Sequence, residues 1–358
     1  MKLLFHPHIL RYKYRFKIAH TTRDVQETLI IELQDTDQDG NVISGFGEAT
    51  DNPYYHVTVE GMMDELEKIR PQIEAYILTN AQNGKQAGTP ETFWDEMHQL
   101  LKHTPFTLCA LDMAAQDLYG KKVGQPLYKL WGLSPEKMPV SNYTIGIDTI
   151  EKMVQKLKDF PWPIYKIKLG TDEDVEIVRA LRQHTDALFR VDANCAWNAE
   201  ETIKNSVELK KLGVEFIEQP LPAHQLEEMK EVYKHSVLPL VADESCLTES
   251  DVARCHGRFH GINIKLTKCG GLTPARRMIA EAKQIGMKVM VGCMTESSVG
   301  ISAIAQLTPL LDYVDMDGTM LIENDVATGV KVKPDGIEFA KENGTGASLL
   351  VDDALQTS

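Results

Sequence analysis

The sequence predicts an α/β fold: a modified TIM (β/α) barrel with an α+β capping domain formed by the N-terminal part and the C-terminal tail. Two observations carry this prediction. Residues 140–315 alternate short apolar runs with amphipathic segments about every 25 residues, which is typical of βαβ units around a parallel sheet. Residues 1–135 instead read as strands followed by helices, which is typical of an α+β unit.

The N-terminal part begins with three predicted strands. Residues 14–19, 27–33 and 42–46 are short runs rich in apolar and β-branched side chains, and the turn signal Asp39-Gly40 separates the last two. Helical spacing of apolar residues begins at residue 57 and returns over residues 105–119.

The barrel strands are predicted from eight apolar runs. They are residues 140–145, 164–169, 188–191, 214–217, 238–242, 262–266, 288–291 and 312–315. Eight strands in about 180 residues fit a barrel better than an open sheet. A doubly wound sheet stays open as an alternative, although its glycine fingerprint after the first strand is missing. We therefore expect a capping domain at 1–135, a catalytic barrel at 136–325, and a C-terminal segment at 326–358 that returns to the cap.

Composition excludes several classes of function. The net charge of −14 argues against a nucleic-acid partner, because binding phosphates requires clustered Lys and Arg. The sequence lacks a signal-peptide pattern and any run of roughly 20 apolar residues, so no membrane partner is expected. Its six cysteines form no CxxC pair and are interpreted as reduced thiols. We expect a cytoplasmic enzyme that forms a homo-oligomer.

Three acids follow successive predicted strands. Asp192, Glu218 and Asp243 are 26 and 25 residues apart, which is one βα unit each. In a barrel the carboxyl ends of the strands meet at the active-site face, so three carboxylates come to one level. Three oxygen ligands, with waters completing an octahedron, favour Mg²⁺ as the cofactor. The alternative is that strand-end acids only cap the following helices. It is the better interpretation for one acid, whereas three acids in register favour the metal site, and the alternative stays open.

Lysines flank the predicted metal site. Lys166 and Lys168 lie two apart and point to the same face of the second barrel strand, while Lys265 lies on the sixth. Lysines so placed face each other across the barrel mouth, an arrangement suited to removing a proton from either face of a carbon. To act as bases, Lys168 and Lys265 need pKa values below the usual value near 10.4, which burial and a nearby cation would provide.

These motifs resemble a known family. The runs KIKLG, DANCAW, IEQP, ADES and INIKLTKCGG resemble the enolase superfamily, muconate-lactonizing subgroup, and are most similar to the dipeptide epimerases. FGEAT and QPLYKLWG match the capping domain and its junction with the barrel. The resemblance implies Mg²⁺-assisted 1,1-proton transfer, an isomerase reaction. It also implies that Lys168 handles the L epimer and Lys265 the D epimer, with Lys166 contacting the intermediate.

The eighth strand indicates the substrate class. Asp315 and Asp317 lie two apart on one face, and the resemblance implies that they bind the α-ammonium of a dipeptide. Two partly buried carboxylates repel each other unless a cation lies between them. The alternative is a pair of solvated acids in a loop. The seventh strand, VMVGCMTES, ends without the His of the mandelate-racemase type.

The cap loop at 17–25 and the barrel residues Tyr143 and Met294 are expected to contact the substrate side chain and thus to set the specificity. Epimerases of Ala-Glu are expected to carry an Arg in this loop, where the present chain has Thr21, with Arg23 shifted by two. The prediction is an epimerase of Ala-Xaa dipeptides in which Xaa is small, apolar or polar, such as Ala-Ala.

Other activities stay open. Arg23 could reach the same place from another register, which would restore an L-Ala-D/L-Glu epimerase. o-Succinylbenzoate synthase, N-succinylamino acid racemase and cycloisomerase are alternatives of the same subgroup. A non-catalytic barrel or a metal-dependent hydrolase are the alternatives from other classes.

Overall fold

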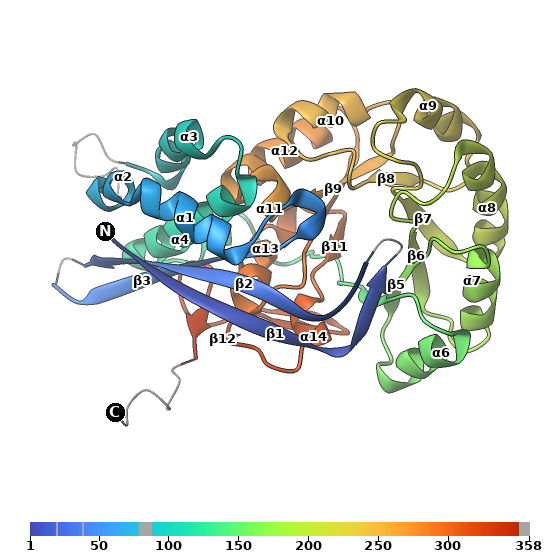
Figure 1. Cartoon of the computed structure of the whole chain (residues 1–358), viewed down its shortest axis with the longest axis horizontal. Helices are drawn as coiled ribbons and strands as arrows, with labels where there is room; N and C mark the ends of the chain where they lie inside the picture. The colour runs from blue at the N-terminus through green and yellow to red at the C-terminus, as the bar shows by residue number, and fades with distance from the viewer. Residues whose placement is uncertain (19–20, 38, 79–87, 351–358) are drawn as a thin grey trace.

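The computed structural model describes residues 1–18, 21–37, 39–78 and 88–350, without the side chains of residues 18 and 21. In Figure 1 the N-terminal strands and helices form one body on the left, and the barrel helices from α6 (Ile150–Asp159) to α10 (Glu249–Cys255) form an arc at the top and right. The capping elements are β1 (Lys2–Ile18), β2 (Thr21–Thr36), β3 (Val42–Thr50), η1 (Pro53–Tyr55), α1 (Val59–Lys68), α2 (Arg70–Ala75), α3 (Pro90–Leu101), α4 (Pro105–Val123) and α5 (Leu127–Leu130).

The cap sheet is a three-stranded antiparallel meander. β2 lies between β1 and β3, and the long β1–β2 hairpin reaches across to the barrel, where the Ile147 N–H donates to Lys17 O at 2.9 Å. The first strand begins at Lys2, far before the predicted residue 14, because the early residues pair along the whole length of β2. Residue 19 of the predicted strand lies outside the described residues.

Helix α4 packs closely on the cap sheet and is buried over most of its length. Two glycines of β3 permit this approach. A Cβ atom on Gly47 would lie 1.9 Å from Ala110 O of α4, and one on Gly45 would lie 2.3 Å from Ala114 O. The sheet and the helix therefore meet backbone to backbone.

The second body is an eight-stranded parallel sheet in sequential order. Its strands are β4 (Tyr143–Ile145), β5 (Ile164–Lys168), β6 (Leu188–Asp192), β7 (Val214–Glu218), β8 (Leu240–Ala242), β9 (Gly261–Lys265), β10 (Lys288–Gly292) and β11 (Tyr313–Asp315). A single parallel bridge between Ser141 and Val314 brings the two edges together. The Met316 N–H also donates to Ser141 Oγ at 3.0 Å, so the sheet is nearly closed into a barrel.

Helices follow the barrel strands on the outside. They are α6 (Ile150–Asp159), α7 (Asp174–Arg182), α8 (Ala199–Lys211), α9 (Leu226–His235), α10 (Glu249–Cys255), α11 (Leu266–Cys269), α12 (Leu272–Gln284), α13 (Ser298–Ala305), η3 (Thr308–Leu310) and α14 (Gly318–Leu321). Only the four-residue α14 follows the eighth strand, and this is where the barrel departs from a regular (β/α)8 repeat.

The C-terminal tail returns toward the cap. Its short strands are β12 (Ala327–Thr328), β13 (Lys331–Lys333), β14 (Gly336–Glu338) and β15 (Ser348–Leu349). Thr345 N–H donates to the buried Asp117 of α4 at 2.7 Å, and Lys121 of the same helix donates to Ala347 O at 3.0 Å. The predicted fold class is confirmed, while the domain bounds 1–135, 136–325 and 326–358 stay predictions.

Within the part of the chain that the structure describes, no helix combines the length and the apolar character needed to cross a membrane. All six cysteines are free thiols.

The contact between β3 and α4 generates a stability prediction. Gly47→Ala is expected to lower the free energy of unfolding by about 1–3 kcal/mol, because the new methyl group must push the helix backbone away from the sheet. Urea denaturation of the wild type and the variant measures this difference. Equal stabilities would contradict the close approach.

Candidate active site

The three predicted metal ligands meet at the carboxyl ends of neighbouring strands. Asp192 ends β6 and Glu218 ends β7, and the two residues are paired in the parallel ladder. Asp243 follows directly after β8. All three side chains are buried, and each offers a carboxylate oxygen within 4.8 Å of the others. This is the end at which barrel enzymes carry their active sites.

Backbone turns after the strands hold these acids in place. Asn194 and Gln219 adopt φ values of 44° and 34°, in the left-handed region that few residues other than glycine enter. Asp192 Oδ1 accepts from the Asn194 N–H at 2.9 Å, and Gln219 Oε1 accepts from the Asp243 N–H at 2.9 Å. The orientation of two triad members therefore depends on the turns that follow β6 and β7.

The triad fits a small divalent cation. Its donors are all carboxylate oxygens, which Mg²⁺ prefers. Glu218 Oε2 is buried and makes no hydrogen bond within the described residues, although Lys166 Nζ lies 2.8 Å away. Burial and the neighbouring Asp192 raise the pKa of Glu218 to about 7. A cation between the acids would relieve this repulsion.

Lys166 and Lys168 project from β5 toward the triad. Lys166 Nζ lies 2.8 Å from Asp315 Oδ2 and 3.2 Å from Asp192 Oδ2, while Lys168 Nζ donates to Asp192 Oδ2 at 2.6 Å. Burial alone would lower the pKa of Lys166, but Asp315 and the triad carboxylates raise it well above its usual range. Lys166 is therefore a fixed positive charge.

Lys265 reaches the triad from the other side. β9 is separated from β5 by the three strands that lead to the acids, and Lys265 Nζ lies 3.0 Å from Asp243 Oδ2. Burial alone would lower the pKa of Lys265, but the charge of Asp243 raises it above the usual range. This is opposite to the lowering that we expected from the sequence, because the carboxylates outweigh burial. A cation bound to Asp243 would weaken this effect.

Asp315 and Asp317 are buried beside Lys166 and are not solvated loop residues. Asp315 Oδ1 accepts from Asn142 Nδ2 at 2.7 Å, and Asp317 Oδ2 accepts from the Thr144 N–H at 2.5 Å. Burial would raise the pKa of Asp315, but Lys166 holds it below the usual range. Burial and the charge of Asp315 raise the pKa of Asp317 to about 7. Asp317 thus lacks a cationic partner in the arrangement described.

A cavity of about 410 Å³ joins these groups, a size suited to a small ligand. Cap and barrel both line it. Its lining residues are Tyr12, Phe16, Arg23, Gln26, Asn52, Pro53, Tyr54, Tyr55, Thr144, Lys166, Lys168, Asn194, Cys195, Asp243, Glu244, Lys265, Cys293, Met294, Thr295, Asp315, Asp317 and Leu321. Asp192 and Glu218 are not among these residues, but both contact lysines of β5 that are.

The predicted substrate contacts differ in their placement. Met294 lines the cavity. Tyr143 does not, because its ring stacks on Phe160 at 5.0 Å in the barrel wall, and its neighbour Thr144 faces the cavity instead. The side chain of Thr21 lies outside the described residues.

Arg23 lines the cavity but is already paired. Its Nη1 and Nη2 donate to the two carboxylate oxygens of Asp51 at 3.0 and 3.1 Å, and Nη1 also donates to Gln26 Oε1 at 2.9 Å. A two-bond contact of this kind fixes the guanidinium and neutralises its charge.

Sequence reasoning missed three polar residues that hold the site. Asn263 Nδ2 donates to Glu218 Oε1 at 2.9 Å, Asn142 holds Asp315, and Lys268 contacts Asp243. Asn263 had a usable signal, since it lies two residues before Lys265 in an apolar strand and so faces the same way. Lys268 had none, because it lies on the helical turn after the strand.

The comparisons with known proteins agree with this geometry. A family model described as "Enolase C-terminal domain-like" matches residues 148–354, and one described as "Mandelate racemase / muconate lactonizing enzyme, N-terminal domain" matches residues 5–132. The chain belongs to the mandelate racemase / muconate lactonizing enzyme family. The predicted resemblance to the enolase superfamily is thereby confirmed.

Individual members of the mandelate racemase / muconate lactonizing enzyme family are similar over the whole chain. An L-Ala-D/L-amino acid epimerase from Flavobacterium johnsoniae is 57% identical and covers 98% of this chain and 100% of its own. An L-Ala-D/L-amino acid epimerase from a Maribacter species is 54% identical and covers 98% of this chain and 99% of its own. The structure of a dipeptide epimerase from Enterococcus faecalis, solved with Mg and L-Leu-L-Tyr, matches with a TM-score of 0.85 and 28% identity. The match covers 97% of this chain and 99% of the other. The predicted isomerase class is confirmed.

The triad of this family member generates a metal-binding prediction. Mg²⁺ is expected to raise the melting temperature, with a stabilisation of about 2.7 kcal/mol at a concentration of 100 times Kd. Glu218→Gln is expected to remove most of this rise, because a neutral amide replaces one anionic ligand. Thermal unfolding with and without Mg²⁺ measures it.

Glu215→Gln is the matched control, because Glu215 lies on the same strand but pairs with Arg190 outside the triad. If Glu218→Gln responds to Mg²⁺ as the wild type does, the triad is not the metal site.

Proposed function

We propose that the chain is a dipeptide epimerase that inverts the α-carbon of the C-terminal residue of Ala-Xaa dipeptides, with Mg²⁺ as cofactor. The observation that carries this proposal is the cavity between Lys168 and Lys265, which also contains the Asp315–Asp317 pair. Similarity to named L-Ala-D/L-amino acid epimerases over the whole chain supports it.

The substrate carboxylate would be held at the triad. Asp192, Glu218 and Asp243 supply three oxygens, and Lys166 adds a fixed positive charge beside them. Bound Mg²⁺ would act as a Lewis acid that offsets the charge developing as the α-proton leaves. Mg²⁺ bound in a dipeptide epimerase from Enterococcus faecalis supports this assignment.

The two lysines would act as bases on opposite faces of the α-carbon. Lys168, as the neutral amine, takes the proton from the L epimer, and Lys265, as the ammonium, returns a proton to the other face. The roles reverse for the D epimer. General acid–base transfer of this kind contributes typically 10²–10⁴-fold to a rate, provided both groups reach the carbon.

The α-ammonium of the dipeptide would bind at Asp315 and Asp317. Asp315 is already balanced by Lys166, whereas Asp317 has a raised pKa and forms no ion pair with another described residue. A substrate ammonium would supply the missing charge. The substrates of o-succinylbenzoate synthase, N-succinylamino acid racemase and cycloisomerase have no such group, so this acidic pair favours a dipeptide over those alternatives.

The Arg23–Asp51 pair supports a neutral Xaa side chain. A guanidinium held by both oxygens of Asp51 offers little charge to a glutamate of the substrate, and separating the pair would cost both hydrogen bonds. This favours Ala-Ala and related dipeptides over Ala-Glu, so the alternative of an L-Ala-D/L-Glu epimerase is the weaker proposal. The cytoplasmic location and the homo-oligomer stay predictions.

Deuterium exchange tests the proposed reaction. The wild type with Mg²⁺ in D₂O is expected to place one deuterium at the C-terminal α-carbon of Ala-Xaa dipeptides with neutral Xaa, followed by mass spectrometry. The Lys265→Met variant is expected to exchange the α-proton of the L epimer for deuterium without inverting the carbon. Lys168→Met is expected to do the same with the D epimer, because each variant retains one base. Exchange of N-succinylamino acids in place of dipeptides would contradict the proposal, and exchange confined to Ala-Glu would contradict the substrate preference alone.

The raised pKa of Asp317 predicts a pH-dependent KM. Below about pH 7 Asp317 carries a proton that the substrate ammonium must displace, so KM for the dipeptide is expected to rise as pH falls, by up to about tenfold per unit. Above that pH, KM levels off. Asp317→Asn is expected to have a high KM that does not follow this pH dependence, and an identical profile in both enzymes would rule out Asp317 as the ammonium ligand.

A further inference from the structure

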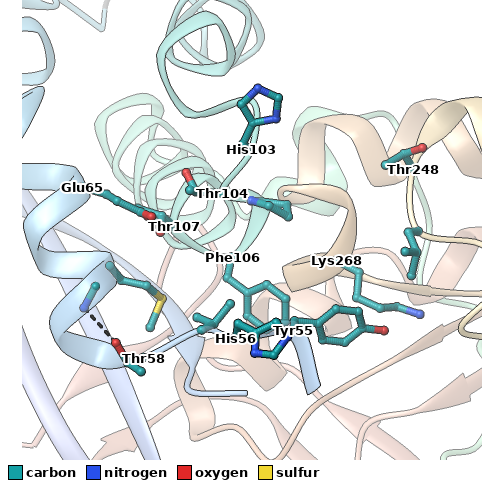
Figure 2. Close-up of a pocket in the computed structure, with 15 residues that line it drawn as sticks. Tyr55, His56, Thr58, Glu65, His103, Thr104, Phe106, Thr107, Thr248 and Lys268 are labelled. Carbon is teal, nitrogen blue, oxygen red and sulfur yellow. Dashed lines mark hydrogen bonds between the residues drawn. The ribbon is translucent and has the colours of Figure 1, made fainter. Parts of the chain in front are cut away.

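Lys268 is a buried lysine that the proposed mechanism does not use. It lies in α11, three residues beyond Lys265, and is 3% exposed. Its side chain lines a second cavity of about 350 Å³ on the cap side of the active site, together with Tyr55 and Phe106 (Figure 2). Lys268 is not among the residues that line the substrate cavity, so it has no direct access to a dipeptide.

The ammonium group of Lys268 binds Asp243 in two places. Nζ donates to the backbone oxygen of Asp243 at 2.8 Å and also pairs with its carboxylate Oδ1. Contacts to the backbone and the side chain of one residue fix the rotation of that side chain. Lys265, in contrast, holds Asp243 through Oδ2 alone, at 3.0 Å.

Lys265 and Lys268 differ in how easily each can move away from Asp243. Both carboxylate oxygens of Asp243 have ammonium partners, so the oxygen whose partner withdraws more easily is the one better exposed to a metal. Among the described residues, Lys265 Nζ donates one hydrogen bond, to Asp243 Oδ2, and it also lines the substrate cavity, so it can turn toward a ligand there. Lys268 is tied to a backbone oxygen that cannot rotate away.

We propose that Lys268 is a positioning residue for the metal site: it holds Oδ1 of Asp243 and thereby presents Oδ2 to the metal. Groups that orient metal ligands from behind typically change metal affinity by 10–100-fold when they are removed. The inference rests on the metal part of the proposed function and is independent of which dipeptide is turned over.

Positioning and simple charge repulsion predict opposite results. Lys268→Met removes one positive charge near the site, which by Coulomb's law alone would strengthen Mg²⁺ binding. If Lys268 positions Asp243, the same variant binds Mg²⁺ more weakly, by about 10–100-fold. Lys268→Gln matches the Met variant in length and lack of charge but keeps an N–H donor, so it is then expected to bind Mg²⁺ more tightly than Lys268→Met.

Isothermal titration of Mg²⁺ into the full-length wild type and both variants, without substrate, measures these affinities. Saturating Mg²⁺ is expected to restore most of the kcat of Lys268→Met, which a misfolded site would not allow. Lys156→Met is the matched control, since Lys156 is a buried lysine paired with Asp148 at 3.5 Å outside the cavity, and its Mg²⁺ affinity should equal that of the wild type. Mg²⁺ affinity in Lys268→Met equal to or above that of the wild type would overturn the inference, whereas a wild type that binds no Mg²⁺ would contradict the proposed function itself.

Discussion

Burial of several carboxylates in one small volume is the constraint on which the rest of the site depends. Like charges this close repel strongly in a water-poor interior, so each acid needs a cation, a hydrogen bond or a proton. The groups gathered here are Asp192, Glu218, Asp243, Glu244, Asp315 and Asp317, with Lys166, Lys168, Lys265 and Lys268. With every group ionised, the acids exceed the lysines by two charges, the charge of one divalent cation. Burial and neighbouring acids raise the pKa of Glu218, Glu244 and Asp317 to about 7, so these three acids carry the unbalanced part of the charge.

The fold makes this concentration of charge possible by bringing charged residues of neighbouring strands to one end of the barrel. Lys168, Asp192, Glu218 and Lys265 end their strands, and Asp243 directly follows β8, while apolar residues of β5 to β9 contribute to the barrel core. The closing seam contributes as well. The residues around the Ser141–Val314 bridge also hold the eighth-strand acids, through Asn142 to Asp315 and Thr144 to Asp317. Closing the barrel and orienting Asp315 and Asp317 therefore depend on the same few residues.

The sequence was sufficient wherever a short local pattern decides the structure. Strand-end acids one βα unit apart predicted the triad, and residues two apart on a strand predicted that Lys166 and Lys168 share a face. It was insufficient where partners are distant or the register shifts by one residue. Tyr143 was expected at the cavity, but its neighbour Thr144 lies there, because adjacent strand residues face opposite ways. The pairing of Arg23 in β2 with Asp51, the residue after β3, joins distant parts of the cap, and no local pattern reveals it.

The bond between the Ile147 N–H and Lys17 O ties the tip of the long cap hairpin to the barrel through backbone atoms alone. Because no side chain takes part, almost any residue can occupy either position without loosening the attachment. At the hairpin tip, a side chain that lines the cavity, such as that of Phe16, can therefore change while this attachment to the barrel stays in place. A chain built in this way can change the molecules it accepts through drift in the cap, with its chemistry inherited unchanged.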